Sequence, residues 1–303
     1  MRSLYSDSLS GLAVDGDQVV VMGQTLVRVP LAGGDPVTLA SPEGQFGLLV
    51  LGGVAYFEAS HAAGDPIGGK QPTEQTLDAV PVAGGDETTV LGADSAPSLD
   101  SATTDADSLY FPARGQTVIT RFTPPSASID LKFSAGSSID AVAVFGDYVY
   151  VAAQDLIVGG SANGIIERIP KKGGTAGIVV SNIGHPWNLV ADATGLYWQE
   201  DPPGFGTGHI AHAQLDGSRL TTLVEANATS LALASGRLYF STGDTIASIA
   251  TSGGVATTLE SGFKSAGRLT LAGDNLVWVD PASQALSDPT VPTVLTACIP
   301  GSG

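Results

Sequence analysis

A turn of small residues followed by an apolar triplet recurs seven times in this chain of 303 residues, and this repeat constrains the fold more than any other feature. Tyr occupies the middle position in five of the seven triplets, although the chain contains only 7 Tyr. Successive middle positions lie 36 to 54 residues apart. A tight turn that joins two short apolar runs is typical of a β-hairpin. The triplets occupy residues 19–21, 55–57, 109–111, 149–151, 196–198, 238–240 and 276–278.

A second hairpin follows the triplet in most units. Its turn is marked by Gly pairs at 33–34, 84–85, 173–174 and 253–254, and Asp216-Gly217 takes this place in the fifth unit. Glycine favours such turns because it adopts positive φ without a steric cost. Each unit therefore predicts four short strands within about 40 residues, which is the pattern of a β-propeller blade.

We predict an all-β fold in which residues 1–303 form a single β-propeller domain with seven four-stranded antiparallel blades; six blades are the alternative. Closing the ring buries both faces of every sheet and removes the open ends. Low charge (14%) and 39 Gly suit short strands better than long helices. The least regular part is the second hairpin of the last unit, expected within 284–299. The expected blades span 8–42, 43–95, 96–136, 137–183, 184–226, 227–263 and 264–303.

The formal net charge of −17 restricts the partners of the chain. An acidic surface repels phosphate backbones, so general nucleic-acid binding is not expected. Anionic membrane surfaces are disfavoured for the same reason. No apolar run reaches the ~20 residues that a membrane-spanning helix needs. We therefore expect a monomer that binds a protein or an extracellular ligand.

Two further expectations concern compartment and cysteine. Low charge and many Gly, Ser and Thr resemble exported bacterial proteins, which favours an extracytoplasmic location (secreted, periplasmic or lipoprotein) with the leader absent from this sequence. Cys298 is the single cysteine, so it cannot form an intrachain disulfide. Because it ends an apolar run, we expect it to be a small buried side chain.

Two triplets extend into a longer motif. Leu196-Tyr197-Trp198-Gln199-Glu200 and Leu276-Val277-Trp278-Val279-Asp280 resemble the YWTD blade signature. Together with Ile169-Pro170-Lys171-Lys172-Gly173-Gly174, they resemble bacterial propellers of the YWTD-like and DUF5050 type. The resemblance implies the fold and not an activity. YWTD propellers usually have six blades, whereas this chain shows seven units.

Three units carry long insertions between their second and third strands, at 58–75, 152–164 and 199–208. In a propeller these connections share one face with the connections between blades. Binding residues are often on long loops held by a rigid scaffold, so this face is the predicted binding face. Neutral variation in loop length is the alternative interpretation.

Three of the 4 histidines fall on the predicted binding face. Imidazoles near carboxylates suit a metal ion or an acid–base pair. Exposed histidines with no common site are the alternative interpretation. The histidines are His61, His185 and His209, and the nearby carboxylates are Glu58, Asp65, Glu200 and Asp201.

Two functions follow from this face. The first is a non-enzymatic binding protein without a cofactor or a metal, whose aromatic contacts are Trp187 and Phe205; a core position is the alternative for Trp187. The second is a metal-assisted lyase or hydrolase that resembles virginiamycin B lyase-type propellers. That resemblance implies a divalent metal, with His185 or His209 as base and Glu200 as metal ligand. The residues expected to bind under the first hypothesis are His61, His185, Trp187, Glu200, Asp201, Phe205 and His209.

Overall fold

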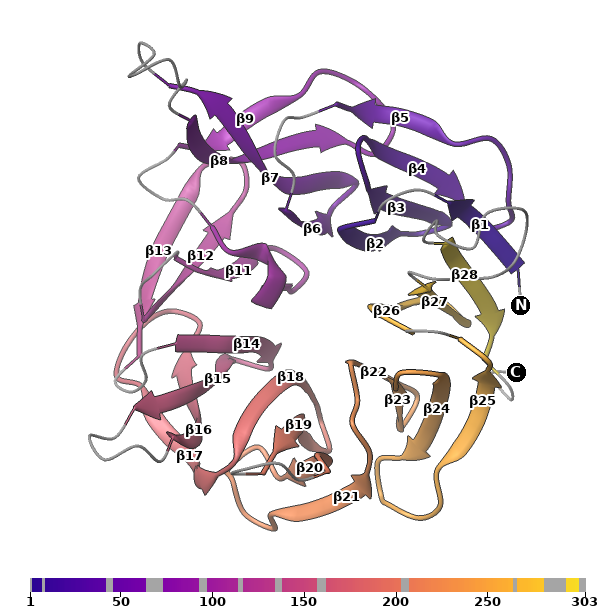
Figure 1. Cartoon of the computed structure of the whole chain (residues 1–303). Coiled ribbons are helices and arrows are strands. Elements are labelled where there is room, and N and C mark those ends of the chain that lie inside the picture. Colours follow the sequence, from indigo (N-terminus) through magenta and orange to yellow (C-terminus); the bar gives the residue numbers. More distant parts are fainter. Residues whose placement is uncertain are drawn as a thin grey trace, which may run out of the picture.

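The described residues form seven four-stranded antiparallel sheets arranged around a central axis (Figure 1). The structure is a computed structural model, and it describes residues 2–6, 9–41, 46–63, 73–92, 97–113, 117–133, 138–156, 162–202, 207–263, 266–280 and 293–299. The prediction of a seven-bladed β-propeller is confirmed, and the alternative of six blades is wrong. Within the described residues, no helix is long and apolar enough to cross a membrane.

Each blade runs from an innermost strand at the channel to an outermost strand at the periphery (Figure 1). Blade 1 comprises β2 (Gly11–Asp15), β3 (Gln18–Met22), β4 (Leu26–Pro30) and β5 (Val37–Ala40). Blade 2 comprises β6 (Phe46–Leu51), β7 (Val54–Ala62), β8 (Thr73–Pro81) and β9 (Thr88–Leu91). Blade 3 comprises β10 (Thr103–Thr104), β11 (Leu109–Pro112), β12 (Val118–Thr123) and β13 (Ala127–Lys132), and a 3-10 turn, η2 (Leu99–Ser101), precedes it.

The remaining blades follow the same plan. Blade 4 comprises β14 (Ser138–Phe145), β15 (Tyr148–Leu156), β16 (Ala162–Pro170) and β17 (Gly177–Ile183). Blade 5 comprises β18 (His185–Asp192), β19 (Gly195–Asp201), β20 (His209–Ala213) and β21 (Thr221–Glu225). Blade 6 comprises β22 (Ser230–Ala234), β23 (Arg237–Ser241), β24 (Thr245–Ala250) and β25 (Thr257–Ser261). Blade 7 comprises β26 (Leu269–Ala272), β27 (Asn275–Asp280), β28 (Thr293–Cys298) and β1 (Arg2–Ser6).

Blade 7 is assembled from both ends of the chain. Its outermost strand is β1, which pairs with β28 so that Arg2 lies opposite Thr296. The sequence placed all four strands of this blade within 264–303, with a complete hairpin in 284–299. Among the described residues, the stretch 284–299 supplies only the strand β28. Pairing the first strand with the last closes the ring and protects a strand edge that would otherwise remain open.

The recurring triplet forms the core between adjacent blades. Its middle side chain packs against the next blade, and its first and third side chains pack against the preceding blade. Tyr197, for example, packs against blade 6, whereas Leu196 and Trp198 pack against blade 4. All three are fully buried. The triplet recurs because every contact between two blades needs the same three apolar side chains.

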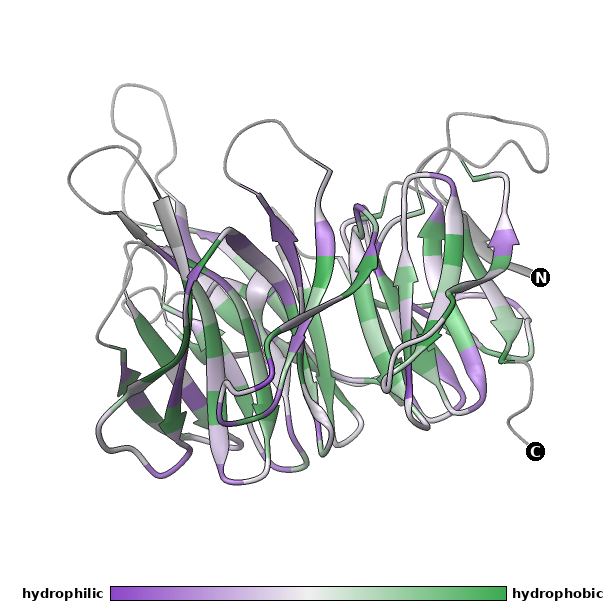
Figure 2. Cartoon of the chain, turned by 90° about the horizontal axis from the view of Figure 1, so that it is seen from below, coloured by the Kyte–Doolittle hydropathy of each residue, from purple (hydrophilic) through white to green (hydrophobic). Residues whose placement is uncertain are grey.

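The two faces of the ring differ (Figure 2). We call the side that bears the connections between second and third strands the hairpin face, and the opposite side, with its tight turns, the turn face. The described ends of the expected long loops of blades 2 and 4 belong to paired strands. In blade 2 the pairing continues to Ala62 opposite Thr73, and in blade 4 it continues to Leu156 opposite Ala162. Two-stranded extensions therefore project from the hairpin face where the sequence predicted irregular loops.

The expectation for Cys298 is wrong, because this side chain is exposed. Cys298 is the last residue of β28 and lies opposite Asn275, the first residue of β27. This final pair lies at the turn face, beyond the packed part of the sheet. The apolar run that precedes Cys298 is buried, but the burial stops before the strand ends.

Candidate binding site

His61 lies in a cluster of polar side chains within blade 2. Its Nε2 lies 2.7 Å from Oδ2 of Asp78, a carboxylate with only 1% of its surface exposed. Thr76 donates to the other oxygen of Asp78 at 2.7 Å. Burial raises the pKa of Glu87, and a hydrogen bond to Asp78 and its negative charge raise that pKa further. His61 thus provides a hydrogen-bond partner for a buried carboxylate and links β7 to β8, which is a structural contact.

Glu58, one of the expected carboxylates, instead connects two blades, and Gln199 does the same elsewhere in the ring. Glu58 is buried, and its Oε1 accepts a hydrogen bond of 2.6 Å from the Leu99 backbone N–H at the start of blade 3. Gln199 occupies the same position of blade 5 and accepts 2.9 Å from the Ala228 N–H. The residue after the triplet therefore ties one blade to the next. Asp65 lies outside the described residues.

Glu200 already has donors on both of its oxygens. Oε1 accepts a 2.7 Å bond from the Gly184 N–H, and Oε2 accepts a 3.1 Å bond from Trp198 Nε1. His209 lies opposite Glu200 in the strand register, and its Nε2 is 3.9 Å from Oε2. The carboxylate thus anchors the segment that enters blade 5.

His185 faces a carboxylate of the neighbouring blade. Its Nε2 lies 3.4 Å from Oδ2 of Asp140, which is on the innermost strand of blade 4. Both atoms are shielded from solvent, yet neither has a hydrogen-bond partner among the described residues. Asp201 lies opposite His185 in the register of β18 and β19. His185 and Asp140 therefore lie at the hairpin end of blade 5, beside the channel.

Bulges interrupt both innermost strands at this point. In β18 the register shifts between Trp187 and Val190, and Asn188 has a positive φ of 51°. In β14 the register shifts between Ile139 and Ala141, so Asp140 has no cross-strand partner. Asn is among the few residues that tolerate positive φ. Bulges redirect side chains and are common beside functional sites.

Four buried polar atoms around these bulges have no hydrogen bond among the described residues, although two of them lie 3.4 Å apart. Two are Asp140 Oδ2 and His185 Nε2, and the others are Trp187 Nε1 and Asn188 Nδ2. A buried polar group without a partner costs about 1–3 kcal/mol, so water or a ligand is expected to bond to these groups. Asp140 and Asn188 also line a cavity of 140 Å³ in the channel. Its lining comes from blades 3 to 6 and is Asp100, Ser101, Ala102, Asp140, Ala141, Val142, Asn188, Leu189, Val190, Ser230 and Leu231.

The candidate site thus contains part of the predicted set. His185 and Trp187 lie on the bulged strand, and Asp201, Glu200 and His209 lie at the adjacent end of blade 5. His61 does not belong to it, and Phe205 lies outside the described residues.

The sequence reasoning missed Asp140 and Asn188. Each is a polar residue inside an otherwise apolar innermost strand, and this interruption was the available signal. Within the described part of the chain, no group of three His, Cys, Asp or Glu side chains lies close enough together to hold a metal ion.

Comparisons with known proteins support the fold. No protein-family model and no curated protein matches the chain. Among solved structures, selenomethionine-substituted virginiamycin B lyase from Staphylococcus aureus is similar, with a TM-score of 0.64, 14% identity, and coverage of 95% of this chain and 94% of that one. The propeller domain of the trilobed protease from Pyrococcus furiosus has a TM-score of 0.62, 11% identity and 91% coverage of both chains. BamB from Moraxella catarrhalis has a TM-score of 0.55, 12% identity, and coverage of 95% and 83%.

These similarities show the fold alone. At such identities they transfer neither an activity nor a partner to this chain. The resemblance to YWTD-like and DUF5050-type propellers stays a prediction, because no family model matches.

Proposed function

We propose that the chain is a non-enzymatic binding propeller that holds a polypeptide partner on its hairpin face, at the channel mouth between blades 4 and 5. The observation that carries this proposal is the set of four unpartnered polar atoms on β14 and β18. An amide side chain from a partner offers both a donor for Asp140 and an acceptor for Asn188 and Trp187. Forming these bonds removes the cost of leaving the groups unpaired.

The size of the cavity supports a polypeptide over a free small molecule. Pockets for drug-sized ligands usually measure about 300–1,000 Å³. The channel cavity measures 140 Å³, which suits one inserted side chain. The paired extensions of blades 2 and 4 rise on the same face and supply walls for the rest of the partner. An extracytoplasmic location and a monomeric state stay predictions from composition.

A selection from a displayed random-peptide library tests the proposal. Asn188→Gly removes the amide and keeps the positive φ, which Gly adopts readily. Asn182→Gly is the matched control, because Asn182 is exposed, has φ 58° and lies on β17 outside the site. We expect selected peptides to share an Asn or Gln, to bind Asn188→Gly about tenfold more weakly, and to bind the control unchanged. Peptides that bind Asn188→Gly and Asp140→Asn as well as the wild type would refute the proposal.

The lyase alternative has weaker support. It needs His185 or His209 together with Glu200, yet His185 pairs with Asp140, and Glu200 is held by two donors. The similar virginiamycin B lyase includes a catalytically inactive variant solved with quinupristin. Incubating this chain with quinupristin and a divalent cation, with chromatography as the readout, is a direct test. Consumption of quinupristin that is lost in His185→Ala would replace the binding proposal.

A further inference from the structure

We call the contact between two neighbouring blades a seam. At two successive seams, an arginine of one blade forms a hydrogen bond to the next blade on the turn face. Arg121 on β12 of blade 3 donates to the Lys171 carbonyl of blade 4 at 2.6 Å. Arg168 on β16 of blade 4 donates to the Leu215 carbonyl of blade 5 at 3.1 Å. Both arginines lie opposite the middle tyrosine of their triplet, since Arg121 pairs with Tyr110 and Arg168 with Tyr150. In these two blades the guanidinium therefore crosses to the turn of the following blade.

At the seam between blades 7 and 1 the same position holds Thr296, which lies opposite Val277 in the triplet of blade 7. The carbonyl equivalent to that of Lys171 belongs to Leu31, because both follow the third strand and precede a Gly pair. The backbone around it is the same. Leu31 N–H donates to the Asp17 carbonyl at 2.7 Å, and Lys171 N–H donates to the Asp147 carbonyl at 2.8 Å.

A side-chain pair next to Thr296 in blade 7 also has an equivalent in blade 3. In blade 7 the Cys298 thiol donates to Asn275 Oδ1 at 3.4 Å. In blade 3 the hydroxyls of Ser108 and Thr123, at the corresponding positions, lie 2.6 Å apart. The two seams thus share a frame, and the seam between blades 7 and 1 lacks the crossing arginine.

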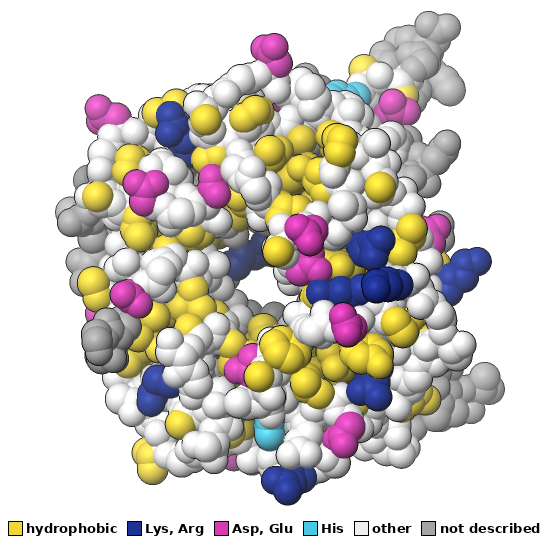
Figure 3. Space-filling model, turned by 180° about the vertical axis from the view of Figure 1, so that it is seen from behind, with side chains coloured by type: hydrophobic (Ala, Val, Ile, Leu, Met, Phe, Trp, Pro, Cys, Tyr) yellow, Lys and Arg dark blue, Asp and Glu magenta, His cyan; other side chains and the backbone are white. Residues whose placement is uncertain are grey.

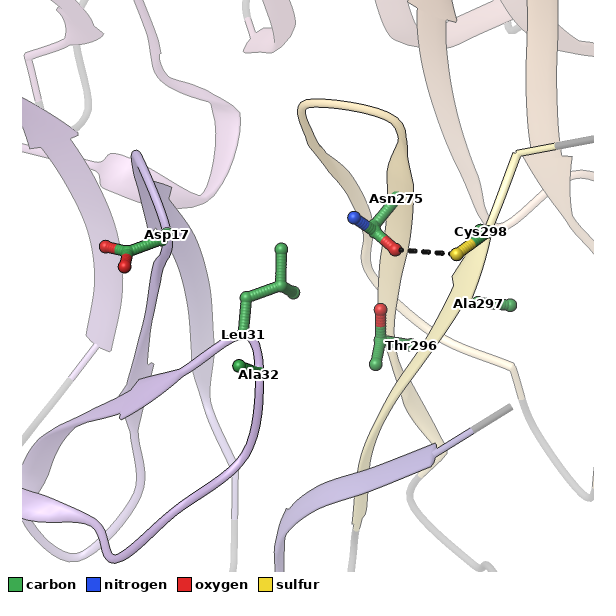
Figure 4. A pocket seen from close by; sticks show the side chains of 7 residues that line it. All are labelled: Asp17, Leu31, Ala32, Asn275, Thr296, Ala297 and Cys298. Atoms are coloured by element: carbon green, nitrogen blue, oxygen red, sulfur yellow. Dashed lines mark hydrogen bonds between the residues drawn. The ribbon is translucent and has the colours of Figure 1, made fainter. Parts of the chain in front are cut away.

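A cavity of 550 Å³ lies in this seam (Figure 4). Leu31 and Ala32 line one side, and Asn275, Thr296 and Cys298 line the other. No Lys or Arg is among the described residues that line it. Thr296 is only 7% exposed, and its Oγ1 is buried with no partner in the part of the chain that the structure describes. A buried hydroxyl without a partner, in a residue that lines a cavity, is a candidate acceptor for a ligand that enters there.

We propose that this cavity binds a small alkylguanidinium ligand, in the place that corresponds to the guanidiniums of Arg121 and Arg168 at the seams between blades 3 and 4 and between blades 4 and 5. The aliphatic part packs against Leu31, Ala32 and Ala297, as the stem of an arginine packs along apolar surface. The guanidinium donates to Thr296 Oγ1 and to the Leu31 carbonyl. The net charge of −17 favours the approach of a cation. This site lies on the turn face and does not depend on the function proposed for the hairpin face.

The single thiol makes the proposal testable in the intact chain. Cys298 lines the cavity and is exposed, so its alkylation by neutral iodoacetamide reports whether the cavity is occupied. The probe is butylguanidinium, and butylurea is its neutral analogue of the same shape. A ligand of this size is expected to bind with a dissociation constant on the order of 1 mM. Butylguanidinium at ten times that constant should slow alkylation about tenfold, since about one site in eleven then remains empty.

Two variants separate this site from general attraction to an acidic surface. Thr296→Arg should place its own guanidinium at the Leu31 carbonyl, slow alkylation without any probe, and abolish the effect of butylguanidinium. Cys298→Ser should keep one equivalent of butylguanidinium bound in calorimetry, because the thiol is only the reporter. Where Thr296→Arg does not fold, Thr296→Gln is the second variant, and it should weaken the protection by butylguanidinium severalfold. Equal protection by butylurea, no protection by either probe, or unchanged protection in a folded Thr296 variant would overturn the proposal.

Discussion

The seam between blades 3 and 4 and the seam between blades 7 and 1 have the same backbone frame and different side chains. In the first, Arg121 crosses the seam, and Lys171 forms an ion pair with Asp105 at 2.7 Å. Tyr110 donates to the same carboxylate at 2.9 Å. In the second, the positions of Arg121 and Lys171 hold Thr296 and Leu31.

The difference shows that the apolar triplet is sufficient to join two blades. Both seams enclose cavities of similar size on the turn face, 510 Å³ beside Arg121 and 550 Å³ beside Thr296. The charged groups are therefore an addition to a common packing unit. Figure 3 shows the turn face, where Lys and Arg side chains gather on one side of the central opening, on the side of blades 3 and 4. Cations are concentrated at one seam and lacking in the lining of the other.

The largest expected effect concerns the middle residue of the triplet. Tyr110→Ala removes a fully buried ring together with its hydrogen bond, and it should lower the free energy of unfolding by about 3–5 kcal/mol. Val277→Ala at the other seam removes fewer atoms and should cost about 1–2 kcal/mol. Urea unfolding followed by tryptophan fluorescence measures both. Equal losses of free energy would show that Tyr110 stabilises its seam no more than the aliphatic Val277 stabilises the other.

Substitutions at the third-strand position should change the free energy of unfolding in opposite directions at the two seams. Arg121→Ala removes a charged donor to a carbonyl and should cost about 1–2 kcal/mol. Thr296→Val replaces a buried hydroxyl without a partner by a methyl group of similar shape, and it should stabilise the fold by up to about 1 kcal/mol. Calorimetric unfolding of both variants checks the contrast. A destabilised Thr296→Val variant would mean that the hydroxyl has a partner in solution.

A pH-dependent contribution is expected at the charged seam alone. Burial raises the pKa of Asp105, but hydrogen bonds from Lys171, Asp107 N–H and Tyr110 outweigh it, so the pKa lies below its usual value of 3.8. A carboxylate with a lowered folded-state pKa stabilises the fold above its unfolded-state pKa, and this stability is lost as the pH falls through the folded-state value. Asp105→Asn should therefore be less stable than the wild type at pH 7, and the difference should shrink below pH 3.8.

This last effect is the smallest, because the pair is partly exposed and such pairs contribute about 0.2–1 kcal/mol. Free energies of unfolding measured from pH 2 to pH 7 for both proteins give the profile. Ala272→Ser, at the position of blade 7 that corresponds to Asp105, is a control whose difference from the wild type should not depend on pH. A constant difference for Asp105→Asn across the range would show that the ion pair does not contribute.

The fold could be predicted from the sequence because the triplet has one physical task at every seam. The positions of Tyr197 and Trp198 are apolar in every unit because both faces of each blade must be buried. The candidate site was only partly predictable. His185 and Trp187 were recognised by residue type, but Asp140 and Asn188 gain their importance from bulges that a strand pattern does not reveal.

Other side chains make contacts that the sequence pattern does not reveal. His61 pairs with a buried carboxylate seventeen positions further along, and Glu58 binds the next blade. Cys298 belongs to an apolar run but lies past its buried part. The cavity at Thr296 was not predicted, because a cavity between two blades depends on how their side chains pack.

Pairing of β1 with β28 also has a consequence for biosynthesis. A ribosome makes β1 before every other described strand of the ring, and its partner emerges after all the others. Six blades can form by local pairing as they appear, whereas the seventh must wait for a contact between distant parts of the chain, and such contacts form slowly. The exposed edge of β1 stays unpaired throughout this interval. Translation that stops before residue 293 leaves a string of blades that cannot close, and this open product is distinguishable from the finished ring by proteases.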